Sequence, residues 1–266
     1  VILAVGTEIS ETDLWELAIQ IPGKIIRIDL DPASLAKPHA ATIAMLADAA
    51  PALQMILDHL PQMDVAARTA ANAKFVADHI ANETQGEDDL RKDLRRILSV
   101  IRESLPADTI IASDMTQIAY AANEIFPMEH PRSWIHPVGF GTLGFALPAA
   151  IGAKAGMPDR PVVAMLGDYG FQYTVNELGT AAELKQSLPV LLWNNDALGQ
   201  IRDDMVNKAI EPNAVTLINP DFQSLARAYG CLAEKPATLA ELGPAITRAL
   251  AAGKPTLIEM TPRMLR

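Results

Sequence analysis

The stretch VVAMLGDYGFQYTVNELGT, residues 162–180, decides the fold class. It opens with an apolar run, turns at Gly167 and Asp168, and continues with a pattern typical of a helix. An apolar run without polar alternation is typical of a strand covered on both faces, as in parallel sheets with helices on either side. The stretch therefore predicts one strand-to-helix step of an α/β fold.

The same alternation continues along the chain and predicts an α/β fold with mainly parallel, doubly wound sheets. The expected strands span residues 1–7, 24–32, 109–113, 162–166, 190–194 and 256–260, with a weaker one near Cys231. The expected helices span residues 12–20, 49–60, 89–104, 115–125, 143–155, 175–185, 221–229 and 239–251.

A polar stretch that contains a glycine, ANETQGEDDL at residues 81–90, is expected to link two domains. We therefore expect a first domain at residues 1–85 and a second at residues 86–266. The chain begins VILAVGTE, without a methionine and already inside a strand-like pattern. This start favours a chain that is the later part of a longer protein.

The composition argues against several classes of function. The net charge is −10 and no run is rich in Lys or Arg, so we expect neither a nucleic-acid nor a membrane partner. No stretch has the ~18 apolar residues of a membrane helix, and none resembles a signal peptide, which favours a cytoplasmic protein. The single cysteine, Cys231, excludes an internal disulfide and a cysteine-based zinc cluster. We expect it to be a buried structural thiol.

Polar residues follow two of the expected strands. Asp168 follows one of them, and Asn194, Asn195 and Asp196 follow the next. Ligands of open α/β sheets bind beyond the carboxyl ends of the strands. A carboxylate and an amide there supply hard oxygen ligands for Mg²⁺, completed by a backbone carbonyl and phosphate oxygens. The alternative is local: Asp168 caps the next helix and the Asn-Asn-Asp sequence forms a turn.

A glycine-rich stretch, HPVGFGTLGFALPAAIGAKAG at residues 136–156, leads into a helix of small residues. A bare backbone of this kind can approach a flat heterocycle closely. The same glycines also suit close packing of a helix, so both interpretations stay open.

The sequences GFGTLGFALPAAIGA (139–153), GDYG (167–170) and NN (194–195) together resemble the thiamine diphosphate enzymes of the acetolactate synthase and 2-oxoacid decarboxylase superfamily. The resemblance covers residues 89–260 as the C-terminal, diphosphate-binding domain. The first segment, which includes GKIIRIDLDPASL, resembles the later part of the central domain of the same enzymes.

The resemblance implies thiamine diphosphate and Mg²⁺ as cofactors. It implies Mg²⁺ binding by Asp168, the Asn195 side chain and the Ala197 carbonyl. It implies a cofactor site that comprises Gly141, Thr142, Leu143, Gly167, Asp168, Tyr169, Gly170, Phe171 and Asn195. In that site the backbone around Tyr169–Phe171 holds the diphosphate, and the Gly141 carbonyl accepts the 4′-amino group. Leu143 supports the bent shape of the cofactor from below.

Two positions depart from the family pattern. Tyr169 stands where a small residue is usual, and Gly170 stands where many relatives have Ser. Whether Tyr169 lies at the cofactor or packs outward stays open.

Relatives activate the cofactor with a glutamate from an N-terminal pyrimidine-binding domain, normally supplied by a partner subunit. Glu8, Glu11 and Glu16 fall in the central-domain match and do not take that role. The catalytic glutamate is therefore expected outside this chain, which we expect to be inactive in isolation. The parent is expected to be a homodimer or homotetramer.

The expected reaction is decarboxylation of a small 2-oxo acid. Asp203 and Asp204 suit a cationic substrate such as 2-oxoarginine, and their surroundings resemble 5-guanidino-2-oxopentanoate decarboxylases. The alternative for this pair is a solvated acidic helix start. Two other functions stay open for the protein. One is an acetolactate-synthase-like carboligase whose parent binds FAD, outside this fragment. The other is a non-catalytic nucleotide-binding α/β module.

Overall fold

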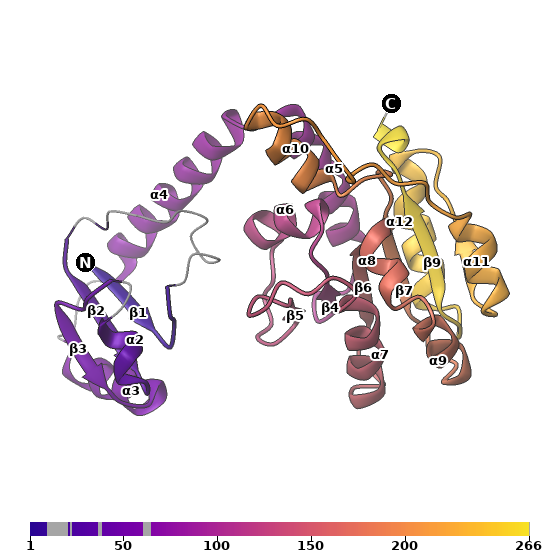
Figure 1. Ribbon diagram of the computed structural model, residues 1–266. Coiled ribbons are helices and arrows are strands. Elements are labelled where there is room, and N and C mark those ends of the chain that lie inside the picture. The colour runs from indigo at the N-terminus through magenta and orange to yellow at the C-terminus, as the bar shows by residue number, and fades with distance from the viewer. Residues whose placement is uncertain (10–20, 22, 37–38, 61–64, 266) are drawn as a thin grey trace. The chain divides into compact units, whose positions relative to one another are not determined.

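The computed structural model describes residues 1–9, 21, 23–36, 39–60 and 65–265. These residues form two compact units, Val1–Thr84 and Gln85–Arg266 (Figure 1). The helix expected at residues 12–20 lies outside the described residues.

The first unit contains a three-stranded parallel sheet in the order β1-β2-β3. Its elements are β1 (Ile2–Val5), β2 (Ile25–Asp29), α2 (Pro32–Ala36), β3 (Ile43–Leu46), α3 (Ala49–His59) and α4 (Val65–Gln85). The predicted strands β1 and β2 and the predicted helix α3 are confirmed. Helix α3 begins after Asp48, whose side chain accepts a hydrogen bond from the Ala50 N–H at 2.9 Å.

The boundary between the two units falls inside the expected linker at residues 81–90, but the first half of that stretch is helical. Helix α4 continues to Gln85, and only residues 86–88 separate it from α5 (Asp89–Ser104). Ala81, Glu83 and Gln85 are strong helix formers, which favours continuation of the helix through this mainly polar stretch. The Asp88 side chain then caps α5 by accepting from the Arg91 N–H at 2.7 Å.

The second unit is a six-stranded, all-parallel sheet in the order β5-β4-β6-β7-β9-β8, which confirms the predicted fold class (Figure 1). Its strands are β4 (Ile110–Ser113), β5 (Trp134–Ile135), β6 (Val162–Gly167), β7 (Pro189–Trp193), β8 (Leu232–Glu234) and β9 (Thr256–Met260). Its helices are α5, α6 (Gln117–Ile125), α7 (Ala146–Gly156), α8 (Asp168–Tyr173), α9 (Glu177–Glu183), α10 (Gly199–Asn207), α11 (Phe222–Ala228), α12 (Leu239–Leu250) and the short 3₁₀ helix η1 (Pro262–Leu265).

Helices cover both faces of this sheet. Alternate residues of each strand point to opposite faces: Met165 packs in one core with α5, α6 and α12, and Leu166 packs in the other with α7, α9 and α11. Every residue of β6 and β7 is buried, as the apolar runs predict. The sheet is therefore a rigid support for the residues that follow its strands.

The stretch that opened the sequence analysis differs from expectation in one respect. A short helix, α8, begins at Asp168 directly after β6, and the helix expected at residues 175–185 begins only at Glu177. The interpretation of Asp168 as a cap of the later helix is therefore wrong. None of the helices in the part of the chain that the structure describes is both long and apolar enough to cross a membrane.

Candidate functional site

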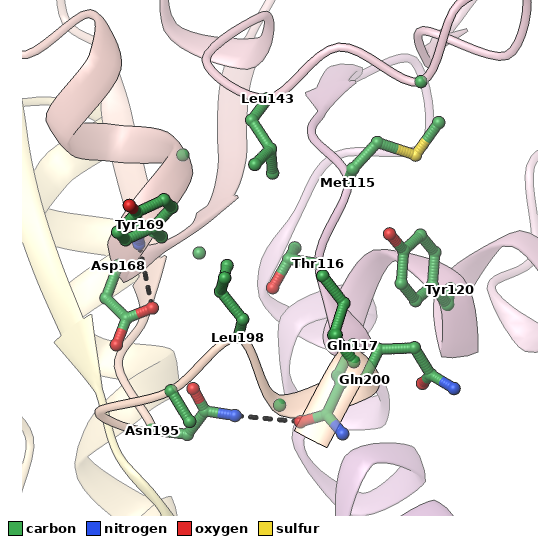
Figure 2. Close-up of a pocket in the computed structure, with 16 residues that line it drawn as sticks. Met115, Thr116, Gln117, Tyr120, Leu143, Asp168, Tyr169, Asn195, Leu198 and Gln200 are labelled. Atoms are coloured by element: carbon green, nitrogen blue, oxygen red, sulfur yellow. Dashed lines mark hydrogen bonds between the residues drawn. The ribbon is translucent and has the colours of Figure 1, made fainter. Parts of the chain in front are cut away.

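A cavity of about 190 Å³ opens where β4, β6 and β7 end (Figure 2). Its walls come from the residues that follow these strands and from the glycine-rich loop before α7. Leu143 points into the cavity from that loop, and Leu198 points into it from the segment after β7 (Figure 2).

Sheet topology explains why the cavity lies there. The chain leaves β4 toward β5 and then returns to the other side of β4 to form β6. The two connecting helices, α6 and α7, pack on opposite faces of the sheet. This reversal leaves a crevice between the ends of β4 and β6, which is the usual place for a ligand in such a sheet.

Asp168 is the buried carboxylate of this cavity, with 2% of its surface exposed. Its oxygens accept hydrogen bonds from the Tyr169 N–H at 2.9 Å and from Asn219 Nδ2 at 2.8 Å. Burial raises the pKa of this carboxyl group, the bond from Asn219 opposes the rise, and the nearby charge of Asp196 adds to it. Within the described ranges no ion pair of Asp168 is found.

Asn219 joins Asp168 to the end of the neighbouring strand. Its Nδ2 also lies 3.0 Å from Asn194 Oδ1 and 3.1 Å from Asp196 Oδ1. Its Oδ1 accepts from Gln172 Nε2 at 3.1 Å, which fixes the NH₂ group toward the two carboxylates. Nothing in the local sequence predicts this role, because Asn219 lies 51 positions from Asp168.

Asn195 lies across the cavity floor from Asp168, and the pairing of β6 with β7 explains their proximity. The Asn195 Nδ2 donates to Gln117 Oε1 at 2.8 Å (Figure 2). The following residue, Asp196, has φ +53°, a left-handed conformation that Asp tolerates better than most residues. This turn is secured by a bond from the Leu198 N–H to the Val215 carbonyl at 2.9 Å.

Asp114 connects the glycine-rich loop to the turn around Asp168. It follows β4, is fully buried, and its Oδ2 accepts from the Gly144 N–H at 2.8 Å. Burial raises the pKa of Asp114, and bonds from backbone N–H groups oppose the rise. On the other side of the loop, the Thr174 hydroxyl donates to the Gly144 carbonyl at 3.0 Å. Gly144, with φ +84°, is thus fixed from both sides.

The position of Asp114 accounts for the glycine at position 170. A Cβ added to Gly170 would lie 2.8 Å from Asp114 Oδ2. That oxygen accepts a hydrogen bond from the backbone of the loop. A larger residue at position 170 therefore requires Asp114 or the backbone of α8 to move.

Tyr169 lies at the cavity, where it contributes to the lining (Figure 2). Its ring packs edge-on against Tyr173, with centroids 5.4 Å apart and planes at 86°. Tyr169 therefore lines the cavity and does not pack away from it.

Most residues that the sequence assigned to the cofactor meet at this cavity. They are Gly141, Leu143, Gly167, Asp168, Tyr169, Gly170, Asn195 and the metal candidate Ala197. Two others do not line it: Thr142 is exposed, and the side chain of Phe171 is buried in the core against Phe222.

The two substrate candidates lie on α10. Asp203 accepts from Gln117 Nε2 at 2.8 Å and pairs with Arg202 at 2.8 Å. Asp204 is exposed and accepts from Gln200 Nε2 at 3.1 Å. Burial raises the pKa of Tyr120, which lines the cavity, and the charges of Asp114 and Asp204 add to the rise. Neither carboxylate lines the cavity: both follow the lining residues Gln200 and Ile201 on α10, and Asp203 has partners of its own.

Several lining residues were not predicted. They are Met115, Thr116, Gln117, Tyr120, Leu198, Gly199, Gln200 and Ile201. The signal for the first four was Asp114, a polar residue at a third strand end. Asp114 lies near the other two strand ends only because β4 pairs with β6, and the sequence does not specify that pairing.

His136 and Cys231 have structural environments, which for Cys231 confirms the expected buried thiol. The imidazole of His136 lies 2.7 Å from Ser113 Oγ and 3.2 Å from Asn123 Nδ2, and burial lowers its pKa. The Cys231 thiol is buried, and burial raises its pKa to about 11. Neither side chain lines the cavity.

The fold and the cavity define an α/β domain with a cavity at the carboxyl edge of a parallel sheet. The chain belongs to the thiamine pyrophosphate enzymes: residues 114–260 match the family described as "Thiamine pyrophosphate enzyme, C-terminal TPP binding domain". The resemblance found in the sequence is thus confirmed.

Individual relatives agree with this assignment. A probable 2-ketoarginine decarboxylase (AruI) of Pseudomonas aeruginosa is 45% identical over 97% of this chain and 46% of its own length. The acetolactate synthase isozyme 3 large subunit of Escherichia coli is 31% identical over 86% of this chain and 42% of its own length. The chain therefore spans less than half the length of these curated relatives.

The same fold occurs in a solved structure. The thiamine diphosphate-dependent 4-hydroxybenzoylformate decarboxylase of Rhodococcus jostii RHA1 aligns with a TM-score of 0.71 and 23% identity. The alignment covers 98% of this chain and 48% of that one. At this identity the likeness establishes the fold.

Proposed function

We propose that this chain is the diphosphate-binding part of a thiamine diphosphate- and Mg²⁺-dependent decarboxylase that acts on a cationic 2-oxo acid such as 2-oxoarginine. The observation that carries the proposal is Asp168, a buried carboxylate beside Asn195 in the cavity at the switch point of the sheet. We also propose that residues 1–85 are part of a central domain and that residues 86–266 are the cofactor-binding domain.

The residues present fit a magnesium ion. Asp168 is desolvated, and the hydrogen bonds that it accepts come from neutral groups, so a cation offsets the cost of its burial. Across the described part of the chain, no three His, Cys, Asp or Glu side chains group together to hold a metal. An ion here would therefore take Asp168, the amide oxygen of Asn195 and the Ala197 carbonyl, with phosphate oxygens completing its shell.

The loop before α7 fits the organic part of the cofactor. Gly141, which has φ +68°, lines the cavity, and Leu143 points into the same space (Figure 2). Asp114 and Thr174 fix this loop through Gly144. We propose that the Gly141 carbonyl orients the cofactor's amino group and that Leu143 supports its bent shape.

Bound thiamine diphosphate supplies an electron sink for cleavage of the bond between a 2-oxo group and its carboxylate. The residues of this chain bind the cofactor, orient it and exclude water from one side of it. We propose that the proton transfer that activates the cofactor depends on a glutamate of a pyrimidine-binding domain outside this chain. The isolated chain is therefore expected to be inactive, and the active assembly is expected to be a homodimer or homotetramer.

Substrate choice rests on the relatives and on α10. The 45% identity to the probable 2-ketoarginine decarboxylase exceeds the 31% identity to the acetolactate synthase. Asp204 lies on α10, four residues after the cavity-lining Gln200, and a carboxylate can bind a guanidinium through two hydrogen bonds. We propose that Asp204 recognises the cationic end of the substrate, with Asp203 contributing to the negative charge of the region.

A carboligase of the acetolactate synthase type is the second candidate, because 31% identity over 86% of the chain also links it to that group. FAD in such a parent would bind outside this chain. Membership of the thiamine pyrophosphate enzymes disfavours a non-catalytic nucleotide-binding module.

Substrate competition tests the proposal. The full-length protein, supplied with thiamine diphosphate and Mg²⁺, is assayed for CO₂ release from 2-oxoarginine and from pyruvate. We expect the larger kcat/KM for 2-oxoarginine, and Asp204→Asn should raise KM for 2-oxoarginine but not for pyruvate. Equal or better use of pyruvate contradicts the proposed substrate, and acetolactate formation favours the carboligase.

A further inference from the structure

Gln117 connects the end of β7 to α10. This residue begins α6, is 7% exposed, and bonds in both directions. Its Oε1 accepts from Asn195 Nδ2 at 2.8 Å, and its Nε2 donates to Asp203 Oδ2 at 2.8 Å. The first of these bonds is drawn in Figure 2.

The contact between Gln117 and Asn195 is packed against the backbone of α10. A Cβ added to Gly199 would lie 2.3 Å from Gln117 Oε1 and 2.5 Å from Asn195 Nδ2. Only a glycine leaves room for this pair of amides. Both amides are therefore held in place, and the remaining freedom is which end of each faces the other.

Hydrogen-bond chemistry removes that freedom. A carboxylate accepts only, whereas a primary amide has one accepting and one donating end. Arg202 engages Asp203 Oδ1 through Nε at 2.9 Å and Nη2 at 2.8 Å, which leaves Oδ2 for Gln117. Gln117 must turn its NH₂ group to Asp203 and its oxygen to Asn195. Asn195 must then present its NH₂ group to Gln117.

The consequence reaches the proposed metal site. With its Nδ2 committed to Gln117, Asn195 has its Oδ1 on the opposite side of the amide, available to the cavity. A reversed amide would present hydrogens to a cation and bind it poorly.

We propose that Asp203, acting through Gln117, is a positioning residue that fixes the amide of Asn195 with its oxygen toward Mg²⁺. This inference rests on the proposed function, because it concerns the same ion. It gives Asp203 a role distinct from recognition of the substrate, which falls to Asp204. This role depends on the fact that a carboxylate only accepts hydrogen bonds. An asparagine of the same shape can also donate, so it would not fix the orientation of the Gln117 and Asn195 amides.

Magnesium binding tests this inference. The full-length protein is held with saturating thiamine diphosphate, and MgCl₂ is titrated while intrinsic fluorescence or calorimetry reports formation of the complex. Loss of an outer partner of a metal ligand typically weakens metal binding by about 10–100-fold. We expect Asp203→Asn to raise the half-saturating Mg²⁺ concentration by about 10-fold. Asp204→Asn removes the same charge from the neighbouring residue and is expected to change it less than about 2-fold.

A second background separates orientation from charge. In Asn195→Asp both ends of residue 195 are oxygens, so its direction no longer matters. On that background, Asp203→Asn is expected to weaken Mg²⁺ binding no more than Asp204→Asn does. A purely structural role for Asp203 predicts instead the same loss on both backgrounds.

The outcomes are distinguishable. If the unaltered protein does not bind thiamine diphosphate with Mg²⁺, the proposed function fails and the inference fails with it. Suppose that the unaltered protein binds both. If Asp203→Asn then changes the half-saturating Mg²⁺ concentration no more than Asp204→Asn does, or raises only KM for 2-oxoarginine, the inference alone is overturned. A large loss that persists on the Asn195→Asp background also overturns it.

Discussion

Replacing Gly170 with alanine tests the packing that joins the two halves of the site. The added Cβ would lie 2.8 Å from Asp114 Oδ2, a distance that requires one group to move. Asp114 is fully buried and tied to the Gly144 N–H, so it cannot yield cheaply. Overpacking of a buried site typically costs about 1–3 kcal/mol. For a unit of this size, that corresponds to a fall in Tm of roughly 2–12 °C.

Gly152 provides a matched control. It lies inside helix α7, and a Cβ added there would meet nothing within 4 Å. Replacing a helical glycine with alanine gains up to about 1 kcal/mol of helix propensity. Gly152→Ala should therefore raise Tm, whereas Gly170→Ala, also in a helix, should lower it.

The assay is thermal unfolding of the full-length protein without cofactor, followed by circular dichroism. On an Asp114→Ala background the clash is gone, so the cost of Gly170→Ala should shrink or change sign. A Gly170→Ala variant that is stabilised as much as Gly152→Ala would refute the reasoning, because it would show that Asp114 does not occupy that space.

Three further predictions concern Asp168, Asn219 and Cys231. The raised pKa of Asp168 means that the folded protein binds its proton more tightly than the unfolded chain. Its contribution to stability is therefore present at low pH and is lost as pH rises from ~4 through the raised value. Asp168→Asn should remove this decline from a plot of Tm against pH, and an unchanged plot would contradict it. Asn219→Ala removes the bond to Asp168 and should weaken Mg²⁺ binding by about 10–100-fold in a magnesium titration; unchanged affinity would exclude this contact as a support. Cys231, buried with its pKa raised to about 11, should resist alkylation by iodoacetamide at pH 8 until the protein is unfolded in urea. Rapid labelling of the native protein would show that the thiol is accessible.

The sequence predicts well what depends on local pattern. The apolar runs before Gly167 and Asn194 identify two buried strands, and the parallel fold brings the residues that follow them to one edge. Asp168 and Asn195 therefore meet at the cavity, as the pattern indicates.

The residues that orient these ligands were not predictable in the same way. Gln117 lies 78 positions from Asn195, and their contact depends on the order β4-β6-β7. Asn219 comes from a connection after α10 whose path no local pattern specifies. Gly170 was identified in the sequence as a departure from the family pattern. The carboxylate that a side chain at this position would meet belongs to Asp114, at the end of another strand.

The prediction of secondary structure was wrong where helix propensity and polar composition point to different structures. The linker expected at residues 81–90 was read from polar composition, yet helix-forming Ala, Glu and Gln continue α4 to Gln85. Helix α8, which begins at Asp168, was missed for a different reason: a helix of six residues is too short to show a hydrophobic period.

The central claim is that Asp168 and Asn195 hold Mg²⁺ together with a diphosphate. Calorimetry of thiamine diphosphate binding to the full-length protein, with and without Mg²⁺, tests it most directly. Truncating a buried, hydrogen-bonded charged partner typically costs about 2–5 kcal/mol, so Asp168→Ala should weaken Mg²⁺-dependent binding by about 30-fold or more. Asn195→Ala should weaken it in the same direction. The claim would be contradicted if both variants bound thiamine diphosphate as strongly as the unaltered protein, or if binding to the unaltered protein did not depend on Mg²⁺.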